Sequence, residues 1–274
     1  EEIKSDLGPF PFPSFWGPNS GIESTRWIAE SAKWIEMKNS PSLSLVYLPH
    51  LDYCLQKLGP DHTDVAKELM AIDKVFKELL DFYDSRNVRV VVLSEYGITP
   101  VSKPVHLNRI FREEGWLAIK DELGREMIDL GASKAFAIAD HQIAHIYVND
   151  SEIHDKVLEK VKLTQGVDEV MSGNDLDDLE LRHDRAGDII AVSDESSWFT
   201  YYFWKDDDVA PDYARCVDIH RKPGYDPVEL FFDPAIKFKR FKLLSKLIRK
   251  KLGFRYLMDL IPLNAEMVRG SHGR

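Results

Sequence analysis

The apolar residues of this chain follow two patterns, short continuous runs and longer stretches with helical spacing. Short apolar runs that are bounded by polar residues or proline are typical of buried strands. Such runs predict strands at 45–48, 88–93, 134–139, 143–148 and 188–193, and the aromatic run 198–204 is strongly β-prone as well. Apolar residues at helical spacing predict helices at 24–39, 63–83, 150–161 and 237–251, with a loop and a helix between 99 and 116.

This alternation predicts an α/β fold, a three-layer α/β/α sandwich with a mostly parallel central sheet. Residues 45–48, 63–83 and 88–93 form one strand–helix–strand unit, which is expected to be right-handed. In open sheets of this kind, functional groups gather just past the carboxyl ends of the strands. Asp52 follows the first strand and Glu95 follows the second, so both are expected at the same edge of the sheet.

Composition places the chain among soluble globular proteins. Its 274 residues, 44% hydrophobic and 30% charged, can bury a core as one large domain or two small ones. The net charge of −10 gives no support for nucleic-acid binding, and no apolar run is long enough for a transmembrane segment. The two cysteines make no disulfide framework, and Cys54 is either an ordinary thiol or a soft metal ligand near Asp52. The sequence leaves the compartment and the oligomeric state open.

Three short segments carry the groups best suited to chemistry. They are YLPHLDYCLQKLGP at 47–60, LSEYGI at 93–98 and RGSHGR at 269–274. In order and approximate separation, they resemble the metal-site segments of the nucleotide pyrophosphatase/phosphodiesterase group in the alkaline phosphatase superfamily. The resemblance implies that residues 1–274 are the C-terminal part of one alkaline phosphatase-like catalytic domain, truncated, with an acidic surface insertion at about 165–187.

The resemblance also implies a centre of two divalent metal ions, zinc in the family, whose ligands carry over residue by residue. Asp52 matches a metal-binding Asp, and His272 matches a metal-binding His. Gln56 stands where the family has a second His, Glu95 where it has an Asp, and Tyr96 where it has a further His. Because an amide and a phenol replace two imidazoles, oxygen donors dominate, which favours Mn²⁺, Mg²⁺ or Ca²⁺ over zinc.

A member of this group would be a metal-dependent phosphohydrolase. Its substrate would be a small phosphate ester or nucleotide-like molecule, cleaved at a phosphodiester, nucleotide pyrophosphate or phosphonate-type bond through a covalent phospho-enzyme. Nothing in this chain matches the family's Thr or Ser nucleophile or its first metal-binding Asp. We therefore expect the nucleophile in a missing N-terminal half and no activity from this chain alone. The alternative is an inactive binding or scaffold domain with a vestigial metal site.

Three histidines and one lysine are further candidates for substrate binding. His141 and His145 have the spacing of a zincin helix, but Gln142 replaces the general-base Glu and the following Ile-Tyr-Val favours a strand. The two histidines are expected either to contact phosphate or to be structural. His220 and Lys222 lie in a polar loop, where they either hold an anionic group or belong to a solvated rim.

The segment 237–251 differs from the rest of the chain in its charge. It carries eight basic residues and no acidic one, and its apolar residues make it an amphipathic helix. A helix on a membrane surface has this pattern. A helix docked on the sheet, with its basic face in solvent, is the favoured interpretation.

Truncation would also affect stability. The central strands of an α/β/α sheet are buried on both faces, and loss of a neighbouring strand would expose unpaired N–H and C=O groups along an edge. We therefore expect the isolated chain to be marginally stable and prone to self-association through that edge.

Overall fold

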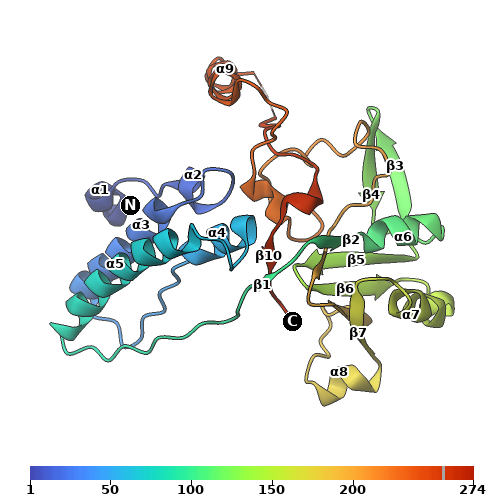
Figure 1. Cartoon of the computed structure of the whole chain (residues 1–274), viewed down its shortest axis with the longest axis horizontal. Helices are drawn as coiled ribbons and strands as arrows, with labels where there is room; N and C mark the ends of the chain where they lie inside the picture. Colours follow the sequence, from blue (N-terminus) through green and yellow to red (C-terminus); the bar gives the residue numbers. More distant parts are fainter. Residues whose placement is uncertain (255–256) are drawn as a thin grey trace.

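The structure is a computed structural model that describes residues 1–254 and 257–274, and it combines a helical N-terminal part with a part built on small sheets (Figure 1). The helices are α1 (Glu2–Leu7), α2 (Phe12–Phe15), α3 (Ile22–Asn39), α4 (His50–Leu58), α5 (Val65–Asp84), α6 (Leu107–Glu113), α7 (His154–Lys162), α8 (Asn174–Asp178) and α9 (Lys239–Lys251), with 3-10 turns η1 (Ser151–Ile153), η2 (Pro227–Leu230) and η3 (Ala265–Met267). The strands are β1 (Thr99–Pro100), β2 (Lys103–Val105), β3 (Ala118–Glu122), β4 (Arg125–Asp129), β5 (Ala135–Asp140), β6 (Ile143–Val148), β7 (Val167–Ser172), β8 (Ile189–Ser193), β9 (Ser197–Phe199) and β10 (Gly270–Ser271).

The predicted helices are confirmed, with α3, α5, α6, α7 and α9 within a few residues of their expected bounds. Asp150 caps η1, where its side chain accepts a hydrogen bond from the Glu152 N–H at 3.1 Å. α3 and α5 pack on each other and form a small core of their own. That core contains Ala29, Ala32, Val75, Leu79 and Tyr83.

The main sheet has the strand order β5-β6-β8-β7, and all of its pairs are antiparallel. β5, β6 and β8 confirm the strands predicted at 134–139, 143–148 and 188–193. The mostly parallel central sheet is not confirmed, because the two-residue connection between β5 and β6 is too short to return the chain in a parallel direction. β2 and β9 pair in parallel, but in a separate sheet of two strands.

The aromatic run 198–204 forms the centre of the larger core. Only its first residues are in a strand, since β9 ends at Phe199, and the run continues as irregular chain to Trp204. All of its side chains are nevertheless almost completely buried. Phe111 of α6 and Val157 of α7 belong to the same core, so these two helices pack on the sheet part of the molecule. Burial here does not require a strand, because large aromatic side chains fill the space between elements.

The strands predicted at 45–48 and 88–93 are wrong within the described chain. Residues 45–48 lie in the connection from α3 to α4, and residues 88–93 lie in the connection from α5 to β1 (Figure 1). Most of their apolar side chains are exposed, with Leu45 at 90% and Leu93 at 80%, whereas Val46 and Leu48 pack against the small core of α3 and α5. A sequence suited to a buried strand forms one only beside partner strands, and the described residues place none next to these segments. The expected right-handed strand–helix–strand unit is therefore not formed either.

The acidic stretch 165–187 contributes the edge strand β7, which pairs with β8, and the short helix α8. α8 buries one side chain, Leu176, and its neighbours in sequence are mostly exposed. The stretch is therefore joined to the main sheet through β7 and exposed beyond it. That it is an insertion into the family's domain stays a prediction.

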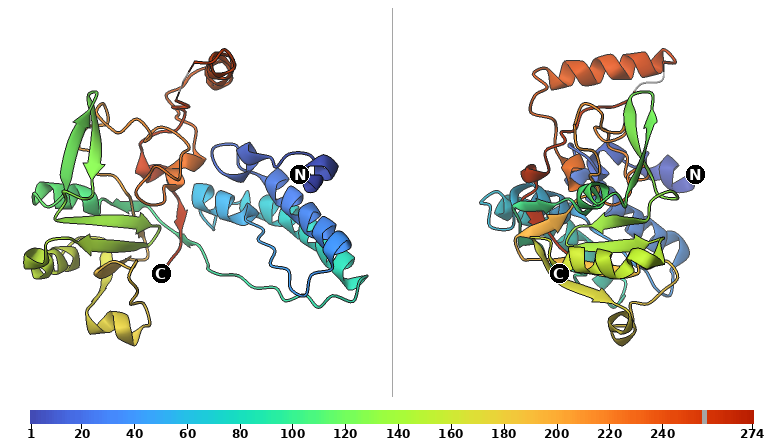
Figure 2. Two further views of the ribbon diagram at one scale, coloured as in Figure 1. Left: turned by 180° about the vertical axis from the view of Figure 1, so that it is seen from behind. Right: turned by 90° about the vertical axis from the view of Figure 1, so that its right-hand side faces the viewer.

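α9 stands away from the rest of the molecule in both views of Figure 2, and it is not docked on a sheet. The favoured interpretation of 237–251 is therefore wrong, and the physical reason lies in how the helix is attached, which is described below. Among the described helices, none combines the length and the apolar character needed to cross a membrane.

Candidate functional site

Asp52 and Gln56 lie one turn apart on α4, and the spacing of four residues places both on one face of the helix. The helix begins at His50, directly after Pro49, and ends before Gly59, whose φ of 83° suits glycine. Asp52 is partly buried and Gln56 is completely buried. Asp52 is thus part of a helix instead of a loop after a strand.

The C-terminal segment 269–274 runs between α4 and the turn that joins β5 to β6. On one side, the Arg269 N–H donates to the Gln56 carbonyl oxygen at 2.9 Å. On the other side, the Gln142 N–H donates to the His272 carbonyl oxygen at 2.8 Å. These backbone bonds fix the position of His272 relative to both neighbours.

Four aromatic side chains form a continuous stack at this junction, and we call Tyr96, His272, His141 and Tyr225 the ring stack. The Tyr96 and His272 rings are nearly parallel, with centroids 3.7 Å apart. The His272 and His141 centroids are 3.8 Å apart, and those of His141 and Tyr225 are 4.3 Å apart. The Tyr96 hydroxyl donates to Asp52 Oδ1 at 3.2 Å. Three of the predicted metal-site residues therefore meet at one place.

His141 reaches the ring stack because of the turn between β5 and β6. Its φ of 57° lies in the left-handed region, which costs a non-glycine residue roughly 1–2 kcal/mol. The buried Gln142 side chain holds the turn, since its Nε2 donates to the Ser197 carbonyl oxygen at 3.1 Å and its Oε1 accepts from the Thr99 hydroxyl at 3.2 Å. Strained residues held in this way cluster at functional sites.

The site places one carboxyl group among neutral rings. Burial lowers the pKa of His272 to about 4 and lowers that of His141 well below its usual value. Burial raises the pKa values of Tyr96 and Tyr225, so both phenols stay protonated. Burial also raises the pKa of the Asp52 carboxyl. At neutral pH the two imidazoles are therefore uncharged and keep lone pairs available to a ligand.

The side chains around Asp52 provide some of the ligands that a bound cation would need. The Tyr96 hydroxyl, which donates to its carboxyl, and the nearby Gln56 amide are both neutral and offset none of its charge. The buried Gln56 amide lies close enough to lower the pKa of Asp52, yet neither its nitrogen nor its oxygen completes a hydrogen bond. Within residues 1–254 and 257–274, however, no group of three or more His, Cys, Asp or Glu is placed to hold a metal ion. The chain thus offers part of a ligand set.

Three other predicted residues lie outside the ring stack. Glu95 is exposed, although its charge is near enough to raise the pKa of Tyr47, which burial raises more strongly. His145 lies on β6, as expected of a strand instead of a zincin helix, and its Nδ1 accepts from the Gly187 N–H at 3.1 Å. His220 is exposed in a turn. The structure therefore does not bring these side chains to Asp52.

Lys222 is also separate from the ring stack, and its surroundings argue against a substrate-binding role. Its side chain is fully buried between two carboxylates, with Nζ at 2.8 Å from Asp226 and 2.7 Å from Glu229. Glu229 also accepts from the Trp16 indole N–H at 2.6 Å. The ammonium is therefore occupied by an internal ion cluster that links residues far apart in the sequence.

Tyr225 belongs to the site but was not predicted from the sequence. The preceding Gly224 has a φ of 122°, and a side chain there would lie 2.6 Å from the Ala139 carbonyl oxygen. That close approach lets the Tyr225 N–H donate to the same oxygen at 2.8 Å. The glycine within a polar turn is the sequence signal for it, since glycine marks places where two backbones meet.

A separate cavity of about 750 Å³ lies elsewhere in the sheet part. Its walls include His106, Arg109 and Tyr202, and none of the ring-stack residues. Burial lowers the pKa of His106 to about 4, and its Nδ1 lies 2.7 Å from the Thr200 hydroxyl. Size alone therefore does not identify the site, which is defined by the convergence at Asp52.

Comparison with known proteins gives concordant findings. The family model described as type I phosphodiesterase / nucleotide pyrophosphatase matches residues 4–226. An uncharacterized pyrophosphatase/phosphodiesterase of Schizosaccharomyces pombe is 32% identical over 76 residues, which cover 26% of this chain and 16% of that protein. Phosphonoacetate hydrolase from Sinorhizobium meliloti 1021, solved with phosphonoacetate, has a TM-score of 0.51 at 18% identity, over 72% of this chain and 46% of that one. For murine ectonucleotide pyrophosphatase / phosphodiesterase 5, the TM-score is 0.46 at 19% identity, over 63% of this chain and 43% of that one.

The chain thus spans less than half the length of these relatives. The likeness to phosphonoacetate hydrolase supports an α/β fold. It carries no information about substrate for this chain, because the identity of 18% is too low.

Proposed function

Because this chain belongs to the type I phosphodiesterase / nucleotide pyrophosphatase family, we propose that it carries part of the active site of a metal-dependent phosphohydrolase. The bond cleaved would be a phosphodiester, a nucleotide pyrophosphate or a phosphonate-type bond in a small molecule. The nucleophile and the remaining ligands would lie on a part of the catalytic domain outside these residues.

One observation carries the proposal. Asp52, Tyr96 and His272 come from three distant segments, and they meet in a single arrangement of hydrogen bond and ring stack. These are the positions to which the family resemblance assigns metal ligands. A purely structural contact would not need a partly buried carboxyl with neutral neighbours beside an amide that completes no hydrogen bond.

Each residue has a defined task in this site. Asp52 and His272 would hold a divalent cation beside the Gln56 amide oxygen, and Glu95 and Tyr96 would stand at a second position. Such ions, when bound, hold a phosphoryl oxygen, activate the nucleophile and stabilise the leaving oxygen. The Tyr96 hydroxyl orients the Asp52 carboxyl, and its ring fixes one face of the His272 imidazole.

His141 and Tyr225 support the other face of His272. Because both imidazoles are neutral at physiological pH, no positive charge on the rings would compete with a bound cation. The oxygen-rich donor set favours Mn²⁺, Mg²⁺ or Ca²⁺ over zinc. We expect the second position to be the weaker one, because the Tyr96 phenol stays protonated.

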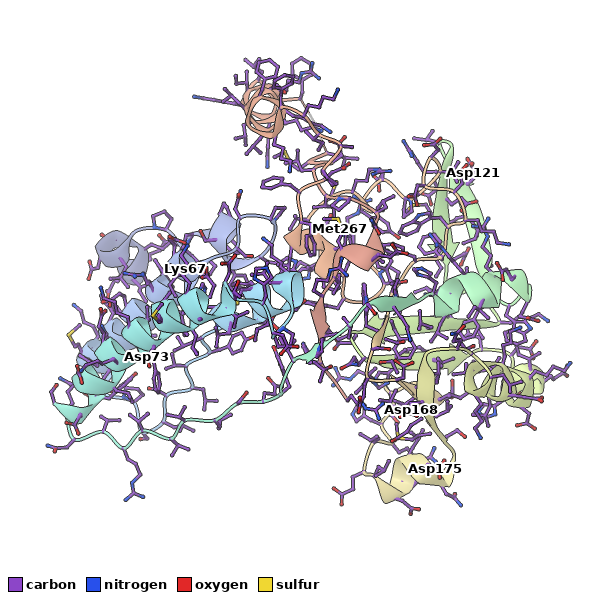
Figure 3. All side chains as sticks on the ribbon, viewed as in Figure 1. Lys67, Asp73, Asp121, Asp168, Asp175 and Met267 are labelled. Carbon is purple, nitrogen blue, oxygen red and sulfur yellow. The ribbon has the colours of Figure 1, made fainter. Side chains whose placement is uncertain are left out.

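Hydrolysis of a nitrophenyl phosphodiester tests the proposed function. This chain alone should show no turnover with Mn²⁺, Mg²⁺ or Zn²⁺, because we propose that the nucleophile lies outside these residues. A polypeptide that joins it to the proposed remainder of the catalytic domain should turn over the substrate, lose activity with a chelator and regain it with Mn²⁺. Asp52→Ala should abolish that activity, whereas Asp73→Ala, on the exposed face of α5, should not (Figure 3).

Two outcomes would contradict the proposal. The first is turnover by this chain alone that survives repurification and disappears in Asp52→Ala, which would place the nucleophile here. The second is full activity of the joined polypeptide after Asp52→Ala, which would remove Asp52 from the site.

A second candidate is a binding or scaffold domain with a vestigial metal site. The observation in its favour is that the Asp52 carboxyl accepts a hydrogen bond from Tyr96, as a structural carboxylate would. In that case neither the chain nor the joined polypeptide would bind Mn²⁺ or hydrolyse the phosphodiester, and the joined polypeptide would still bind a nucleotide such as AMP.

A further inference from the structure

α9 turns its apolar side away from the molecule. Phe241 is 74% exposed, Leu244 55% and Ile248 51%, and these side chains share one side of the helix. In Figure 3 the side chains of α9 project into open space around a helix that stands clear of the other elements. A helix that belonged to the core would bury this side.

The opposite side of α9 attaches the helix to its own chain. Lys246 is 5% exposed, and its Nζ donates to the Leu257 carbonyl oxygen at 2.7 Å and pairs with the Asp259 carboxylate. Lys242 Nζ lies 3.5 Å from the same carboxylate. Ion pairs therefore hold the basic side against the molecule, and the usual arrangement of an amphipathic helix on a globular protein is reversed.

The apolar surface extends past both ends of the helix. Phe238 before it is 76% exposed, and Leu252 and Phe254 after it are 69% and 63% exposed. We call Phe238, Phe241, Leu244, Leu247, Ile248, Leu252 and Phe254 the α9 patch. A contiguous apolar patch of this kind marks an interaction site.

Charge indicates what covers the α9 patch. Residues 237–251 carry eight basic side chains and no acidic one, whereas the rest of the chain has a net charge of −18 (−10 minus 8). Lys242 and Lys246 pair with Asp259, but a second copy would bring the other basic residues of the two helices together, which opposes a helix–helix dimer. An anionic lipid surface offers the apolar phase and the negative charge together.

We propose that α9 lies in the interface of an anionic lipid bilayer, with the α9 patch in the outer acyl region and the flanking basic residues at the headgroups. The ion pairs to Asp259 keep the molecule on the aqueous side of the helix. The acidic remainder of the chain is repelled by the same surface, so contact is limited to α9. The proposal is independent of the phosphohydrolase site.

Co-sedimentation with vesicles tests this proposal on the full chain. We expect binding to vesicles of phosphatidylcholine mixed with phosphatidylserine, weakened by about tenfold or more with phosphatidylcholine alone or in high salt. Leu244→Glu/Ile248→Glu should lower binding to the anionic vesicles by about tenfold or more. The control Leu123→Glu/Leu179→Glu changes two exposed leucines outside α9 and should bind like the wild type. Circular dichroism of each variant checks that the fold is kept.

Equal binding to both kinds of vesicle, or binding that survives Leu244→Glu/Ile248→Glu, would overturn the proposal. So would a wild-type chain that ignores anionic vesicles and sediments as a dimer that the same double variant converts to monomer, because a second copy would then cover the α9 patch. Binding to a soluble acidic protein without any binding to vesicles would overturn it as well.

Discussion

Replacing Lys222 with methionine should destabilise the folded chain by about 3–5 kcal/mol, because it leaves two buried carboxylates without their cation. Lys222 Nζ lies 2.8 Å from Asp226 and 2.7 Å from Glu229, and the side chains of all three residues are at most 2% exposed. The Lys222 ammonium also lies 5.7 Å from the centre of the Tyr201 ring. A loss of this size corresponds to a fall in Tm of about 6–20 °C.

Urea denaturation at neutral pH measures the effect, with Lys67→Met as the matched control. Lys67 points into solvent from α5, so its replacement should change the free energy of unfolding by less than about 0.5 kcal/mol (Figure 3). The triple variant Lys222→Met/Asp226→Asn/Glu229→Gln should recover much of the loss, because no buried charge remains. Asn at 226 keeps the side-chain oxygen that accepts from the Val228 N–H.

The same cluster predicts a dependence on pH. Burial raises the pKa of Glu229, with Lys222 opposing that shift, so removal of Lys222 raises this pKa further. A carboxyl group whose folded pKa exceeds its unfolded value makes the folded state more stable as the pH falls. The free energy of unfolding that Lys222→Met loses relative to the wild type should therefore become smaller as the pH falls from 8 to 5. This range lies roughly above the unfolded pKa of Glu. A deficit below about 1 kcal/mol at neutral pH would refute the assignment of the ion cluster.

Two further predictions concern the C-terminal segment and the unpaired segments. Gly270→Ala should lower the free energy of unfolding by at least about 1–3 kcal/mol, because the new side chain would collide with the Leu55 carbonyl oxygen. Gly97→Ala is the control, since a side chain at Gly97 would meet open space. Equal Tm values for the two variants would contradict this packing. The chain should self-associate in moderate salt through residues 43–48 and 88–93. Val91→Lys/Leu93→Lys should therefore reduce light scattering more than the control Leu123→Lys. A monodisperse wild-type monomer that melts cooperatively above about 65 °C would show instead that the chain is self-sufficient.

The elements that could be predicted from the sequence are those whose partners lie within the chain. β5, β6 and β8 pair with one another, so their apolar runs are buried as the pattern indicates. The runs 45–48 and 88–93 are equally apolar, but an apolar run indicates only that a strand would be stable beside partner strands. Without partner strands among the described residues, they remain connections, and most of their apolar side chains are exposed.

The site could be predicted in part for a similar reason. The family resemblance pointed to Asp52, Gln56, Tyr96 and His272, which the structure brings together. Tyr225 joins them only through the local geometry at Gly224, which no spacing along the chain reveals.

Lys222 was misjudged because a polar, proline-containing loop suggested solvent. The acidic residues at 226 and 229 were the signal that its charge could be neutralised inside the protein. The prediction that α9 docks on the sheet was wrong because the spacing of apolar residues shows which side of a helix is apolar. It does not show whether that side faces the rest of the molecule.

Titration of Mn²⁺ into the chain, followed by the loss of the free-ion electron paramagnetic resonance signal, tests most directly whether Asp52 belongs to a metal site. We expect saturable binding that Asp52→Asn removes, His272→Ala weakens and the exposed control Asp73→Asn leaves unchanged. Circular dichroism of each variant keeps a loss of fold distinct from a loss of ligand. Equal binding by the wild type and Asp52→Asn, or no binding by either, would contradict the proposed metal site.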